Sequence, residues 1–184
     1  MEKIQKLIKN DAAISFKLLK FINSAYFARL TPIDTIKEAI TYIGTEELRK
    51  FIKIVVLSDL NTDKPNELVR NSVIRAQMCE RLGEIFNTDL KKDELFTLGL
   101  FSLMDAMLDC TMEDILEHIN FSDKMQKALL GEDKEFNKIL KIVISIDHGE
   151  WDNNFFSYIS GKSIESKLPD LYLDSVKMAN SLVN

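Results

Sequence analysis

The chain has 184 residues, of which 46% are hydrophobic and 29% are charged, enough to build the core of one domain. Six glycines and three prolines leave few turn-forming residues, which argues against a β-rich fold with many hairpins. The net charge of −5 offers no general attraction for phosphate backbones or anionic lipid, so composition argues against nucleic-acid and membrane-surface roles.

The N-terminal third shows helical periodicity. Apolar spacing predicts a helix over residues 11–24, then a short helix capped by Asp34 or Thr35 and ended by Gly44, then a helix over about 45–60. The cluster "NTDKPNE", rich in Asn, Asp and Pro, follows as the clearest break in the chain. We therefore expect one helical subregion at residues 1–61.

The rest of the chain also follows helical spacing. The predicted helices are a long one over about 66–86, an apolar one over about 92–109, short ones opened by "TMED" at 111–114 and by Ser122, one ending at Gly149, and a last one entered at Pro169. The fold class expected is an all-α multi-helix bundle. It forms a single domain, residues 1–184, with two subregions at 1–61 and 65–184.

Sequence spacing alone supports no catalytic, metal or cofactor site. "GKS" at 161–163 resembles the end of a phosphate-binding loop, but Phe156 stands where that loop needs glycine, and no strand precedes it. His118 and His148 are near helix ends and have no ligand partner at helical spacing. Cys79 and Cys110 lie in apolar helical contexts, which is typical of buried free thiols in a reducing compartment.

The first fifty residues resemble the HDOD domain, an HD-related output domain. The matching positions are Asp11, Lys17-Leu18-Leu19, Asn23-Ser24-Ala25, Phe27, Pro32-Ile33, Thr35-Ile36, Ala39-Ile40, Ile43-Gly44 and Leu48. The second half, with "GLFSLMDAML" at 99–108, is similar to the C-terminal half of bacterial proteins that join an EAL domain to an HDOD domain. The resemblance implies an HD-superfamily-like bundle and an upstream EAL domain that is missing from this chain.

The resemblance also implies a degenerate metal site. Aligning Gly99-Leu100 with the metal-binding helix of HD enzymes places Ser102 and Leu103 at the His-Asp ligand pair and Asn71 at a further histidine. Serine and asparagine are weak neutral ligands and leucine is none, so we expect no metal, no cofactor and no enzymatic activity. Asp105 is expected to share one helix face with Ser102 and Asp109, either as a structural hydrogen-bonding group or as a contact for a partner.

The expected function is a non-catalytic regulatory, protein-interaction module in bacterial signal transduction linked to cyclic di-GMP. Its partner would be another protein or an adjacent EAL domain, and its location the cytoplasm. The candidate interaction or structural motif comprises Asn23, Ser24, Tyr26, Phe27 and Pro32. Two alternatives stay open: a residual metal-dependent phosphohydrolase using Asp105, Asp109 and a histidine, and a small-ligand sensor using the vacated site. The partner's identity and the oligomeric state are not predicted.

Overall fold

The computed structural model describes residues 7–27, 30–60, 65–150, 164 and 166–183. Within these residues every regular element is a helix, which confirms the expected all-α fold. The elements are α2 (Ala12–Ile22), the 3-10 turn η1 (Ala25–Phe27), α3 (Ile36–Leu60), α4 (Asn66–Ile85), α5 (Lys92–Phe101), α6 (Met104–Leu108), α7 (Met112–His118), α8 (Asp123–Leu129), α9 (Lys134–His148) and α11 (Leu168–Val183).

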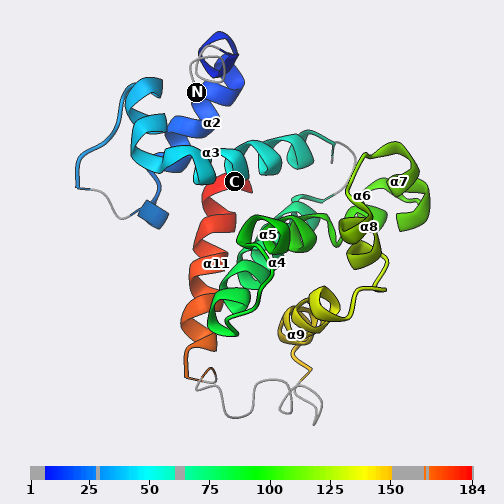
Figure 1. Ribbon diagram of the computed structural model, residues 1–184. Helices are drawn as coiled ribbons and strands as arrows, with labels where there is room; N and C mark the ends of the chain where they lie inside the picture. The colour runs from blue at the N-terminus through cyan, green and yellow to red at the C-terminus, as the bar shows by residue number, and fades with distance from the viewer. Residues whose placement is uncertain (1–6, 28–29, 61–64, 151–163, 165, 184) are drawn as a thin grey trace.

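Helix α4 is the centre of the molecule. It packs against α5, α11, α9 and α3, and these helices surround it in Figure 1. A helix that is surrounded by neighbours buries residues on all of its faces. In α4 the buried residues include polar and charged side chains, namely Ser72, Arg75, Gln77 and Glu80.

The last helix returns to the first part of the chain. Helix α11 runs alongside α4 and also contacts η1 and α2, while α6, α7, α8 and α9 lie on the other side of α4 and α5 (Figure 1). The first subregion expected from sequence therefore shares its packing with a helix from the second.

Helix ends in the described residues follow the capping residues that the sequence offers. Thr111 and Asp114 form the predicted capping box, and Ser122 caps α8. Thr35 accepts a hydrogen bond from the Glu38 N–H at 3.2 Å, so it is the cap at the start of α3. Gly44 has φ 77° and ψ 178°, and this non-helical conformation turns the chain within α3 at the predicted helix end. A positive φ strongly favours glycine, which explains the residue type at this position.

The predicted single helix over 92–109 is wrong. The structure has two helices, α5 and α6, with Ser102 and Leu103 between them. The Ser102 hydroxyl donates to the Gly99 carbonyl at 2.8 Å, and Leu103 has φ −121° and ψ 15°. A serine that bonds the preceding turn competes with the helical ladder, and uniform apolar spacing gives no warning of it.

Helices α4 and α5 touch backbone to backbone at Gly99. A Cβ at this position would lie 2.5 Å from the Arg75 carbonyl oxygen and 2.6 Å from the Ala76 Cα. Neither backbone atom can move without shifting α4. Only glycine therefore allows the two helices to approach this closely.

We predict that Gly99→Ala lowers the free energy of unfolding by about 1–3 kcal/mol, because the added methyl group overpacks a backbone contact. Urea denaturation measures the change. Gly83→Ala is the matched control at the same interface, since the only atom that its Cβ would crowd is the end of the Leu95 side chain, and no backbone atom lies among its nearest neighbours. It should cost under about 1 kcal/mol, because alanine favours a helix over glycine. Equal costs at the two positions would contradict the backbone contact.

Candidate functional site

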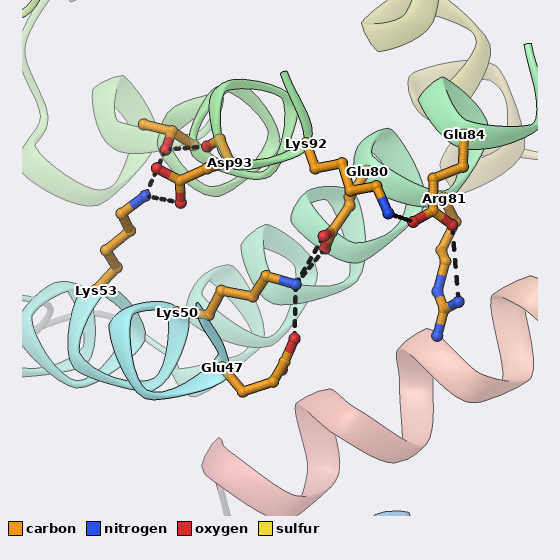
Figure 2. A network of polar contacts seen from close by, with 9 residues as sticks. Glu47, Lys50, Lys53, Glu80, Arg81, Glu84, Lys92 and Asp93 are labelled. Carbon is orange, nitrogen blue, oxygen red and sulfur yellow. Dashed lines mark hydrogen bonds and ion pairs between the residues drawn. The ribbon is translucent and has the colours of Figure 1, made fainter. Parts of the chain in front are cut away.

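A buried ion pair joins α3 to α4. The Lys50 ammonium donates to both carboxylate oxygens of Glu80 at 2.7 Å, and to Glu47 at 2.8 Å (Figure 2). Lys50 and Glu80 are 7% and 6% exposed, and the ammonium also lies 5.3 Å from the centre of the Phe96 ring. Ions removed from water at this depth are tolerated only when their hydrogen-bonding capacity is met.

Burial and pairing act on the two groups in opposite ways. Burial alone would lower the pKa of Lys50, but the hydrogen bonds to Glu47 and Glu80 outweigh it, so its pKa is raised above 10.5. Burial raises the pKa of Glu80 above 4.5, and the lysine offsets only part of this increase. Glu80 is thus a carboxylate whose ionised form depends on the ammonium of Lys50.

A pocket of about 480 Å3 opens above this pair. It is lined by Leu90, by the basic residues Arg49, Lys50, Lys91 and Lys92, and by the acidic residues Glu46, Glu80, Asp89 and Asp93. Several of these charges already have partners: Lys53 bonds Asp93 at 2.6 Å, and Lys92 bonds Glu84 at 2.5 Å (Figure 2). Four bases and four acids leave the pocket without a net preference for an anion or a cation.

A second ion pair lies next to Ser102, one of the positions where the resemblance predicted a lost metal ligand. The Arg75 guanidinium donates to one carboxylate oxygen of Asp147, from Nε at 3.0 Å and from Nη2 at 2.8 Å. Its Nη1 lies 3.5 Å from the Ser102 hydroxyl. Ser102 and Leu103 are half-buried at the bend between α5 and α6, and Asn71 lies one turn before Arg75 on α4. The guanidinium thus contacts Ser102, one of the three positions where the resemblance placed metal ligands.

Asp105 and Asp109 lie apart from this ion pair, on the rim of an open hollow of about 670 Å3. Asp105 is exposed and accepts a hydrogen bond from the Ala106 N–H at 2.8 Å. Asp109 has a left-handed backbone with φ 52°, and the chain bends before Asp105, so the three side chains expected on one helix face do not share one. Among the described residues, no three His, Cys, Asp or Glu side chains form a group that could hold a metal ion.

The N-terminal motif is built around an amide that pairs with backbone. The Asn23 side chain donates to the Ile33 carbonyl at 2.8 Å and accepts from the Ile33 N–H at 2.7 Å. The Ser24 hydroxyl is buried and has no hydrogen-bond partner within the described ranges. Pro32 is exposed in the loop that Asn23 holds. The motif therefore ties down the loop between η1 and α3.

Tyr26 and Phe27 belong to an aromatic cluster under this loop. Phe21 stacks on Phe51 with ring centres 5.8 Å apart, and Phe27 meets Phe21 edge-on at 4.9 Å. Tyr26 is half-buried beside them, and desolvation raises the pKa of its hydroxyl. The interaction role expected for Asn23, Ser24, Tyr26, Phe27 and Pro32 remains a prediction, and the contacts described here are structural.

Helix α3 exposes an apolar ridge that the sequence analysis did not single out. Val56 and Leu60, four residues apart, are 54% and 51% exposed, and half-buried Ile52 continues the row one turn earlier. We call Ile52, Val56 and Leu60 the α3 ridge. The signal was present in the sequence, because the helical pattern of 45–60 has more apolar residues than one buried face needs.

The sequence analysis also missed Lys50, Arg75 and Glu80. Glu80 continues the apolar face formed by Val69, Val73 and Ala76, at the spacing of three and four residues. A charged residue on an otherwise apolar helix face indicates a buried ion pair or hydrogen bond. "GKS" at 161–163 with Phe156 falls outside the described residues, so the structure gives no account of that motif.

We predict that Lys50→Met lowers the free energy of unfolding by about 3–5 kcal/mol, because it leaves Glu80 buried without a counter-charge. Lys53→Met is the matched control, one turn along α3, where the partner carboxylate of Asp93 is 63% exposed. It should cost under about 1 kcal/mol. The double variant Lys50→Met/Glu80→Leu should recover most of the loss in urea denaturation. A double variant as unstable as Lys50→Met would refute the assignment.

The same pair predicts a pH dependence. An acid whose pKa is higher in the folded than in the unfolded state destabilises the fold when it ionises. Protonation of Glu80 at low pH should therefore remove part of the stability loss in Lys50→Met. Its deficit relative to the wild type should shrink as the pH falls from about 8 to about 5. The wild type should lose the stabilisation from Lys50 as the pH rises beyond 10.5, because the pKa of this lysine is raised. Chemical denaturation across this range, with the double variant as the reference, measures both effects.

No single helix among the described residues is long and apolar enough to span a membrane. The bent pair of Lys92–Leu108 with Met112–His118 meets the length and composition requirement only when its two parts are combined.

Two curated relatives are similar to this chain. The cyclic di-GMP phosphodiesterase CdgJ of Vibrio cholerae serotype O1 is 28% identical over 149 residues, which are 81% of this chain and 34% of that protein. The uncharacterized protein YuxH of Bacillus subtilis strain 168 is 27% identical over 188 residues, which are 100% of this chain and 45% of that protein. The chain therefore spans less than half the length of either relative. No solved structure matches it at a significant level.

The relatives correct one expectation. We expected no enzymatic activity because three metal-ligand positions hold Asn71, Ser102 and Leu103, yet the Vibrio relative bears the name of an enzyme. The loss of one ligand set at one place does not exclude catalysis, and the name of this relative overturns the expectation. The HDOD domain family model matches residues 1–150, more than half of the chain. Together with the helical fold, this match shows that the chain belongs to the HDOD domain family.

Proposed function

We propose that this chain is a regulatory, protein-binding module of cyclic di-GMP signalling in the bacterial cytoplasm. The α3 ridge is the observation on which the proposal mainly rests, because Val56 and Leu60 place two large apolar side chains in water. Adjacent exposed apolar side chains on a folded domain are typical of a protein contact. Family membership and the name of the Vibrio relative support the link to cyclic di-GMP.

The proposed partner is a protein domain that makes, degrades or senses cyclic di-GMP, such as an EAL domain, in the same polypeptide or a separate one. The greater length of both relatives supports a role beside other domains. The charged groups next to the ridge would surround such a contact with a polar rim, since Lys17 pairs with Asp59 at 2.9 Å and Lys53 pairs with Asp93.

A second candidate follows from the name of the Vibrio relative, which is that of a phosphodiesterase. In this alternative the chain itself contributes to cyclic di-GMP hydrolysis. The small-ligand sensor receives less support. Gly99 brings α5 into backbone contact with α4 at Arg75 and Ala76, which leaves no space between the helices at that point.

We predict that a photo-crosslinking amino acid at Val56, introduced into the chain in its own host, captures a protein of cyclic di-GMP metabolism. The same amino acid at Leu173 is the control, because this α11 leucine is also 54% exposed but lies outside the α3 ridge. Val56→Glu/Leu60→Glu should reduce capture of that protein at least tenfold, whereas Leu173→Glu should leave it unchanged. Mass spectrometry of the crosslinked product identifies the partner.

Equal capture from both positions, or a partner unrelated to cyclic di-GMP, would refute the proposal. The purified chain should also be incubated with cyclic di-GMP and a divalent metal, and the linear dinucleotide product measured by chromatography. Turnover by the chain alone would favour the second candidate.

A further inference from the structure

Arg75 is a nearly buried cation that contacts three segments of the chain. The side chain extends from α4 and donates to Asp147 near the end of α9 through Nε and Nη2. Its Nη1 lies within reach of the Ser102 hydroxyl at the bend after α5. The side chains of Arg75 and Asp147 are 7% and 15% exposed. Because the guanidinium is planar and always charged, these contacts restrict its orientation as well as its position.

Apolar packing attaches α9 to the core along one face. Its buried face consists of Phe136, Ile139, Leu140, Ile142 and Val143. Asp147 lies one turn beyond this row, at the end of the helix where Gly149 terminates it. The two charge-assisted hydrogen bonds from Arg75 add a directional contact at this end of α9, which apolar packing does not provide.

The same guanidinium also contacts the bend after α5. The Ser102 hydroxyl donates its proton to the Gly99 carbonyl at 2.8 Å. The Ser102 hydroxyl oxygen therefore has a lone pair available to accept from Arg75. Gly99 lies against the Arg75 backbone. Arg75 therefore contacts the end of α5 and the following bend through both its main chain and its side chain.

We infer that Arg75 is an internal bridging cation that holds the end of α9 and the bend between α5 and α6 in one arrangement on α4. It joins these segments as a bound metal would, from a position one turn after Asn71. Arg75 is a positioning residue, and loss of the Asp147 contact releases α9 and the bend together, ahead of global unfolding. This inference goes beyond the proposed function and does not rest on it.

Hydrogen exchange of backbone amides in the full chain tests the inference. In Arg75→Met, amides of the last two turns of α9 and of residues 102–108 should exchange at least tenfold faster than in the wild type, while those of α2 and α3 should not change. Arg70→Met is the matched control on the same helix, where the arginine bonds only Glu67 and Asn180 in the described contacts. It should leave both segments unchanged.

Asp147→Asn covers the case in which Arg75→Met fails to fold, because it keeps the size of the partner while it removes the charge and exchanges one acceptor oxygen for an NH2 donor. It should accelerate exchange in the same two segments. Faster exchange in α9 alone, an equal increase through all helices, or no change in either variant would overturn the inference.

Discussion

The central helix α4 brings two side chains of opposite charge into the interior, and much of the fold depends on their partners. Glu80 requires Lys50 from α3, and Arg75 requires Asp147 from α9. Because an unpaired charge at this depth is far more costly than a poorly packed methyl group, arrangements that separate either pair are strongly disfavoured. Apolar burial supplies the driving force for collapse, and the two ion pairs restrict which helices can lie on which face of α4.

Local signals in the sequence predicted most of the helices. Contacts between residues far apart in the sequence could not be predicted. Thr111, Ser122 and Gly44 mark helix ends because their effects reach only a few residues, and the structure agrees at each. The bend at Ser102 was missed because the apolar row runs through it. The partners of Glu80 and Arg75 lie 30 and 72 residues away, and no periodicity connects such positions. The candidate site was located only where the family resemblance supplied an alignment.

Missing metal ligands limit the chemistry only of the place where they are missing. The family resemblance places Asn71, Ser102 and Leu103 at metal-ligand positions of HD enzymes, where these side chains are weak ligands or none, and Arg75 contacts Ser102. This restricts one type of chemistry at one place. It does not extend to the rest of a longer protein, and the Vibrio relative, of which the match covers only 34%, carries an enzyme's name. Within a family, the scaffold and the reaction vary separately.

The Asn23 side chain has a consequence for how the family is recognised. Its amide acts as an extra peptide unit, giving one donor and one acceptor to the main chain of Ile33. Aspartate is isosteric but would turn a carboxylate oxygen toward a carbonyl, and glutamine would place the same amide one methylene too far away. Natural variation at this position is therefore expected to be narrow even if no ligand ever touches it. A residue that is characteristic of a family can therefore be required for the conformation of a loop as well as for binding a ligand.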